Sequence, residues 1–179
     1  MRAFVRTIEA ISRASGYAAA VLVLLLVVLM TYEVVVRYAF SAPTIWGYEV
    51  TTWVMGGSFV LAIAYALATN SHVRIDFAHD ILGRRAGHAI DLVGYAFFIL
   101  PLLVWLSWGM WDYFYGPFRN GERTGQSAWN PVIWPFRLVL LAGVLIWTLQ
   151  VVAEIVKAAF ALAGRPLHLG APEPPPPLE

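Results

Sequence analysis

Four long runs of apolar residues, separated by short polar segments, dominate the pattern along the chain. The runs cover about residues 14–36, 48–70, 88–112 and 131–160. A helix that crosses the roughly 30 Å hydrocarbon core of a membrane needs about 20 mainly apolar residues, and each run is long enough. The pattern therefore predicts an all-α fold, an integral membrane protein with four transmembrane helices in one domain over residues 1–163.

The composition excludes several classes of protein. Hydrophobic residues make up 60% of the 179 residues and charged residues 13%, whereas an ordinary soluble domain has about 25% charged residues. The absence of cysteine excludes disulfide frameworks, zinc-thiolate sites and iron–sulfur clusters. The net charge of +1 gives no reason to expect nucleic-acid binding. The proline-rich segment 164–179 predicts a disordered tail.

Basic residues are unevenly divided between the two sides that the spans define. Membrane proteins carry more Lys and Arg on the cytoplasmic side. The side with both termini has eight of the 12 basic residues, so we expect both termini in the cytoplasm. The eight are Arg2, Arg6, Arg13, Arg74, Arg84, Arg85, Lys157 and Arg165, and the other four are Arg37, Arg119, Arg123 and Arg137.

The first run has some features of a cleaved signal peptide, with a basic start and the small-residue sequence Ala39-Phe40-Ser41 after it. However, it is longer than the usual apolar run of about 7–15 residues. Glu33 and Arg37 also precede the cleavage-like sequence. We therefore favour an uncleaved helix, in which Glu33 and Arg37 form an ion pair one turn apart.

No charged residue lies near the middle of any span. Proton relays and ion pathways usually need acids or histidines at depth, and Gln150 is among the few polar residues there. The chain is therefore not expected to act as an ion-coupled carrier alone. The sequence also contains no Ser/His/Asp set, paired-carboxylate site or glycine-rich phosphate loop, so we expect no enzyme activity.

Histidines near the second and third spans leave a second interpretation open. His72 and His88 lie at the same ends of adjacent predicted spans, where a haem could bridge them. The spacing of His and Asp over residues 72–80 matches no established metal-binding frame. We expect no cofactor, and keep a haem-binding or redox membrane-anchor subunit as the alternative. A free-standing small transporter is a third possibility.

Five short motifs follow one another across the four spans. They are Arg37-Tyr38, Trp46-Gly47-Tyr48-Glu49, His72-Val73-Arg74-Ile75-Asp76, a segment from Ser127-Ala128-Trp129-Asn130-Pro131 to Trp134, Pro135 and Arg137, and Leu149-Gln150. In order and spacing they resemble the small membrane subunit of tripartite ATP-independent periplasmic (TRAP) transporters, over roughly residues 10–160. One departure is Tyr48, where the family commonly has a second acid before Glu49.

The resemblance implies a scaffold subunit in the bacterial inner membrane. It would hold a large transmembrane transport subunit that carries organic acids with sodium, and a periplasmic substrate-binding protein would supply the substrate. Besides membrane lipids, these two proteins are the expected partners. Residues expected to face the large subunit are Arg37, Trp46, Glu49, Trp53, Gly56, Gly57, His72, Arg74, Asp76, Trp134, Arg137 and Gln150. Residues expected to dock the binding protein are Arg119, Glu122, Arg123 and Trp129.

Overall fold

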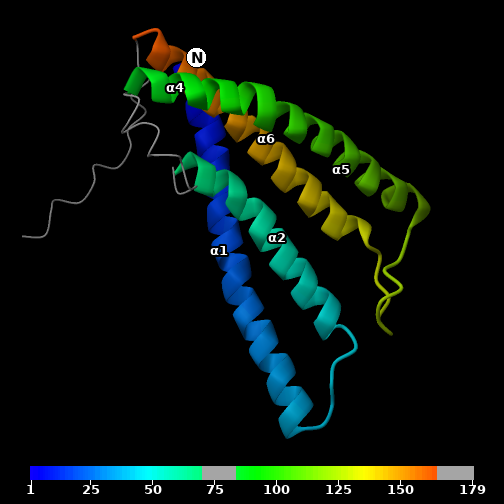
Figure 1. Cartoon of the computed structure of the whole chain (residues 1–179). Coiled ribbons are helices and arrows are strands. Elements are labelled where there is room, and N and C mark those ends of the chain that lie inside the picture. The colour runs from blue at the N-terminus through cyan, green and yellow to red at the C-terminus, as the bar shows by residue number, and fades with distance from the viewer. Residues whose placement is uncertain (70–83, 165–179) are drawn as a thin grey trace, which may run out of the picture.

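A computed structural model describes residues 1–69 and 84–164. Within these ranges the regular structure is helical, and four helices are long and apolar enough to cross a membrane. The predicted all-α fold with four transmembrane helices is therefore confirmed (Figure 1). The elements are α1 (Arg2–Ala39), α2 (Gly47–Ala68), α4 (Arg84–Val93), the π-helix η1 (Gly94–Ile99), α5 (Leu100–Asn120) and α6 (Trp134–Leu162).

Helix α1 is the longest element and runs the full height of the molecule (Figure 1). Its 38 residues correspond to about 57 Å at roughly 1.5 Å per residue. That length exceeds the hydrocarbon core, and the charge-free stretch 14–32 is shorter than the helix. The helix therefore begins well before the apolar run that indicated it, at Arg2.

The third membrane-crossing helix is continuous from residue 86 to residue 120 but changes its winding near the middle. Pro101 has no N–H and cannot donate to the carbonyl group four residues earlier. The π-helical turn Gly94–Ile99 comes directly before it, and the N–H of Leu100 donates to the carbonyl group of Tyr95. Proline and π-helical turns are both known causes of irregularity in a long helix.

The end of α5 differs from the sequence expectation, which placed a loop from residue 113 to residue 130. The helix instead continues to Asn120, and Gly121 ends it in the left-handed conformation at φ 63°. Aromatic stacking supports the added turns, because the rings of Phe114 and Phe118 lie 5.5 Å apart. Phe118 also meets the ring of Trp134, on α6, edge-on.

Helix α6 occupies the centre of the bundle and contacts α1, α2, α4 and α5. Leu67, Leu103 and Val151 bring α2, α5 and α6 together in one buried cluster. Two close approaches of helices need glycine. A Cβ on Gly143 would overlap the side chain of Val60, and one on Gly16 would overlap Tyr65.

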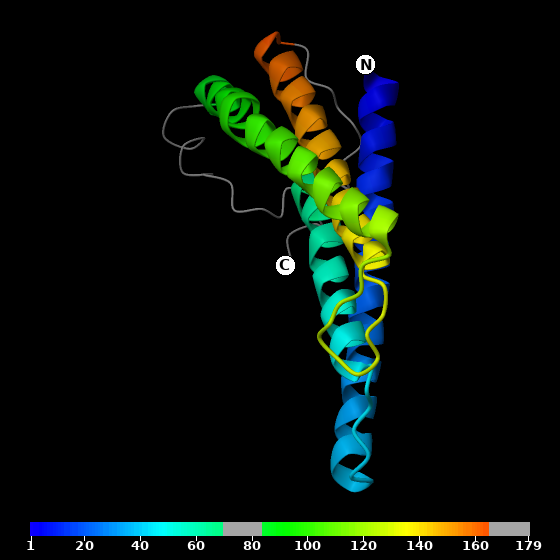
Figure 2. The same cartoon turned by 90° about the vertical axis from the view of Figure 1, so that its right-hand side faces the viewer.

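The molecule has two distinct ends. We call the end that carries the connections 40–46 and 121–133 the loop end, and the opposite end, with the N-terminus, the terminal end (Figure 1). Figure 2 shows that connection 121–133 lies over α2. Polar side chains gather at both ends, and these clusters are the candidate sites.

Candidate functional site

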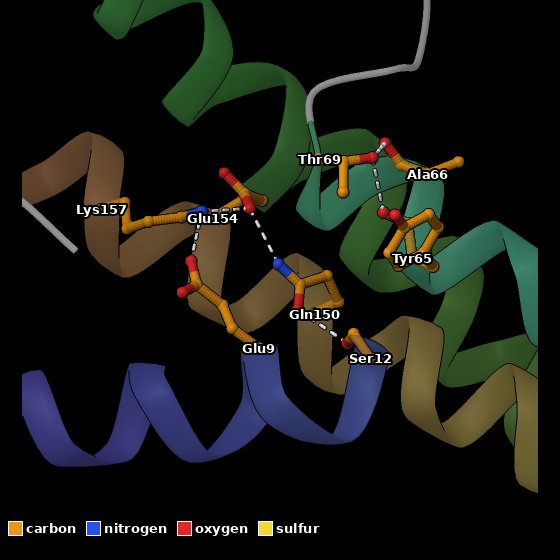
Figure 3. A network of polar contacts seen from close by, with 8 residues as sticks. All are labelled: Glu9, Ser12, Tyr65, Ala66, Thr69, Gln150, Glu154 and Lys157. Carbon is orange, nitrogen blue, oxygen red and sulfur yellow. Dashed lines mark hydrogen bonds and ion pairs between the residues drawn. The ribbon is translucent and has the colours of Figure 1, made fainter. Parts of the chain in front are cut away.

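At the terminal end, a chain of polar contacts joins α1 to α6 (Figure 3). The Ser12 hydroxyl donates to Gln150 Oε1 at 2.8 Å. Gln150 Nε2 donates to Glu154 Oε1 at 2.9 Å. Lys157 Nζ lies 2.5 Å from the same oxygen and 3.1 Å from Glu9 Oε1. One cation therefore holds two carboxylates that come from different helices.

The central residues of this network are buried, so each needs its polar partner for the fold to be stable. The side chains of Gln150 and Ser12 are fully buried, and Glu154 is 3% exposed. A buried charge that loses its partner destabilises a protein by about 3–5 kcal/mol. Gln150, predicted to face the large subunit, thus makes its side-chain contacts inside the chain. The network fixes the register between α1 and α6.

At the loop end, Glu33 and Arg37 form the predicted ion pair on α1, with 2.7 Å between Oε1 and Nη2. The Thr44 hydroxyl donates to the second oxygen of Glu33. The N–H of Gly47, at the start of α2, donates to the same Thr44 oxygen at 3.0 Å. A Cβ on Gly47 would stand 2.6 Å from Glu33 Oε2, so this glycine allows α2 to begin beside α1.

Trp46 precedes this first turn of α2, and its ring stacks on Tyr32 with 6.1 Å between centroids. The aromatic pair lies in the same region as the Glu33–Arg37 pair, because Tyr32 and Glu33 are neighbours on α1. Trp46 and Arg37, both predicted to face the large subunit, are thus brought to one place.

Glu49 ties α2 to the connection between α5 and α6. It is 1% exposed, and its Oε1 accepts a hydrogen bond of 2.6 Å from the Thr124 hydroxyl. Its Oε2 is buried without a hydrogen-bond partner among the described residues. The negative charge stands in the first turn of α2, where the helix dipole favours it. Glu49 therefore anchors connection 121–133 to the start of α2.

Arg137, near the start of α6, holds the other side of this connection. Its Nη1 donates to the Tyr113 carbonyl group at 3.0 Å, and its Nη2 lies 3.1 Å from Glu122 Oε1. The guanidinium also lies 3.9 Å from the centroid of the Tyr113 ring, a cation–π geometry. Arg137 thereby joins the end of α5, the connection and α6.

An aromatic group covers the face of α2 next to α6. Trp53 stacks on Phe136 with 5.7 Å between centroids and lies 6.2 Å from Trp129. Gly56 and Gly57 let α6 approach, because added Cβ atoms would meet Phe136 at 3.2 Å and Val139 at 3.3 Å. These α2 residues, predicted to face the large subunit, thus also pack against α6.

Connection 121–133 carries the residues predicted to dock the binding protein. Arg123 Nη1 donates to the Asn130 carbonyl group at 2.8 Å, and the Gly125 N–H donates to Asn130 Oδ1 at 2.9 Å. Arg119, on the last turn of α5, is exposed. With Glu122 and Trp129 held as described, these residues form one ordered surface at the loop end.

Three predicted residues, His72, Arg74 and Asp76, lie outside the described residues, as does the tail from residue 165. The haem alternative also depends on His72. In the part of the chain that the structure describes, no group of three or more His, Asp or Glu residues could hold a metal ion.

Sequence reasoning missed the contacts between Glu9 and Lys157 and between Glu49 and Thr124. The helical spacing of Glu154 and Lys157 was visible in the sequence. Glu9 and Lys157, however, are 148 residues apart, and no local pattern links such positions.

Comparison with known proteins places this arrangement in a family. No curated protein and no solved structure matches the chain. Residues 26–161 match the family described as tripartite ATP-independent periplasmic transporters, DctQ component. This range contains α2, α4, η1 and α5 in full, α6 up to residue 161, and the loop-end part of α1. The chain therefore belongs to the DctQ family, the small membrane component of TRAP transporters.

Proposed function

We propose that this chain is the fixed membrane scaffold of a sodium-coupled TRAP transporter that takes up organic acids. It holds the large transport subunit in the inner membrane, and a periplasmic substrate-binding protein delivers the substrate. Family membership over residues 26–161 is the observation that carries this proposal.

The distribution of buried surface supports a scaffold role. Within the chain, 6% of the most apolar stretch of α1 and 6% of that of the third membrane-crossing helix are buried, against 39% for α6. The two outer helices thus leave broad apolar faces outside the chain, and the loop ends of α1 and α2 are the part proposed to meet the second subunit. Since lipid gives helices no hydrophobic drive to associate, close packing and polar contacts have to hold such a partner.

The positions of the charged residues support placing the sodium and substrate sites on the partner. Residues 14–32, 50–69, 92–111 and 138–153 contain no Asp, Glu, Lys or Arg. A site that binds sodium and a carboxylate substrate at mid-membrane depth needs polar or charged groups there. This chain supplies few, so the transport chemistry belongs to the large subunit.

The ordered connection 121–133 supports the assignment of a docking surface. Our proposed orientation has both termini in the cytoplasm and the loop end in the periplasm. Arg119 and Arg123 then face the side from which the binding protein arrives. The tethers at Glu49 and Arg137 hold this surface in place before docking.

Co-purification tests the proposal. A tagged version of this chain, expressed with the large hydrophobic subunit, should retain that subunit through detergent solubilisation. Trp46→Ala should lower the amount retained several-fold, because Trp46 lies at the predicted interface. Trp105→Ala removes an equally large and more exposed ring from α5 and should leave retention unchanged.

Failure of the wild-type chain to retain the large subunit would contradict the scaffold proposal. Equal losses in both variants would contradict the placement of the interface at the loop ends of α1 and α2.

A further inference from the structure

An open cleft lies between α1 and α2 at the loop end. It has a volume of about 280 Å³, and its lining residues come from these two helices. The lining is mainly apolar, and its charged groups are Glu33 and Arg37. Its walls include Met30, Val34, Glu33, Arg37, Tyr38 and Tyr48.

The change in polarity follows the length of α1. Met30 and Val34, which are 52% and 51% exposed, lie on the side nearer the middle of the helix. Arg37 and Tyr38 lie one turn beyond, at its end, and the exposed ring of Tyr48 faces the cleft from α2. Along α1, apolar side chains are followed by a cation and a tyrosine ring. The same order is found at the edge of a membrane, where the hydrocarbon core meets the headgroups.

The polar contacts in the cleft favour a group that accepts hydrogen bonds, such as a phosphate, over a cation. Both oxygens of Glu33 are occupied, one by Arg37 and one by Thr44. Arg37 uses Nη2 for Glu33, and its side chain is 52% exposed. Since a guanidinium has five N–H donors, Arg37 retains donors that point to no other group in the described residues. The Glu33–Arg37 pair is neutral overall, so the free capacity in the cleft is that of guanidinium N–H donors.

We propose that this cleft binds one glycerophospholipid. Its phosphate accepts hydrogen bonds from Arg37, and an acyl chain lies along Met30 and Val34. A soluble anion would use Arg37 but would leave the apolar wall uncovered, whereas a phospholipid fits both halves. The inference requires that the chain lies in a membrane. Arg37 is also predicted to face the large subunit, so the lipid would lie at the edge of that interface.

Lipid retention by the purified full-length chain tests this proposal. The chain is delipidated in detergent and titrated with a palmitoyl-oleoyl phosphatidylglycerol, and bound lipid is counted by native mass spectrometry. Arg37→Gln should weaken binding at least tenfold, while Arg37→Lys should keep part of it. Val34→Trp, which fills the apolar half without changing charge, should also weaken binding.

Arg119→Gln is the matched control, because Arg119 is an exposed arginine at the same end but outside the cleft. It should bind lipid like the wild type. Unchanged binding in Arg37→Gln, or an equal loss in Arg119→Gln, would overturn the proposal. Equal affinity for glycerol phosphate, which has no acyl chain, would show an anion site and would overturn the assignment to a lipid. Each of these measurements uses this chain without the large subunit, so a failure here can be told apart from a failure of co-purification.

Discussion

The pair Glu49 and Thr124 shows how one hydrogen bond between distant residues can shape a surface. The two residues are 75 positions apart, and their side chains meet at 2.6 Å. Glu49 belongs to the start of α2, and Thr124 belongs to the connection that carries the predicted docking residues. Loss of this contact would leave the ring contact between Trp53 and Trp129 to hold the connection to α2, and would leave a buried carboxylate without its donor.

Thr124→Val tests this tether, because valine keeps the shape of threonine and removes the hydroxyl group. An unsatisfied buried acceptor costs about 1–3 kcal/mol. We expect a lower thermal unfolding temperature and faster protease cleavage within residues 121–133. Thr124→Ser keeps the donor and should behave like the wild type. Identical behaviour of the valine and serine variants would contradict the tether.

At the scale of helices, small residues set how closely α2 and α6 approach. The backbone of α6 at Gly143 lies against Val60 of α2 so closely that a methyl group would overlap it. Gly109 on α5, by contrast, has open space where a Cβ would stand. The two glycines are thus a matched pair, one packed and one exposed.

Gly143→Ala is expected to destabilise the bundle by about 1–3 kcal/mol, since overpacking a filled core has that cost. Gly109→Ala should be neutral or slightly stabilising, because alanine favours a helix more than glycine does. Thermal unfolding of both variants in the same detergent checks this. If Gly109→Ala lowers the unfolding temperature as much as Gly143→Ala does, the close approach of α2 and α6 is not the cause of the destabilisation.

The sequence predicted the existence of the four membrane-crossing helices more accurately than their boundaries. Apolar run length identified all four crossings, because the membrane imposes a minimum length on each. The beginning of α1 and the end of α5 carry no such signal, since both are stabilised by contacts with α6. Glu9 meets Lys157 of α6, and Phe118 meets Trp134 of α6.

In the candidate site, contacts within one helix could be predicted from the sequence, and contacts between distant residues could not. The Glu33–Arg37 pair was predictable, because its partners stand one helical turn apart. Glu49 and Gln150 were identified as candidate site residues from their types and positions. Their partners, Thr124 and Ser12, could be found only from the folded structure, which brings them together across 75 and 138 residues.

At the scale of the whole molecule, the bundle is asymmetric. Helix α6 is the most buried of the four membrane-crossing helices, while α1 and α5 leave most of their apolar surface outside the chain. Connection 121–133 forms an ordered polar surface at the loop end, and the spans carry no charge at mid-depth. This combination is suited to a subunit that anchors and presents a partner, and it lacks the polar groups of a carrier that works alone.

Substrate uptake into proteoliposomes tests this account most directly. Vesicles hold the large subunit alone, this chain alone, or both, and each receives the substrate-loaded binding protein and an inward sodium gradient. We predict uptake with both subunits and none with this chain alone. Uptake by the large subunit alone should fall at least tenfold below that of the pair. Full uptake by the large subunit without this chain, or any uptake by this chain alone, would contradict the account.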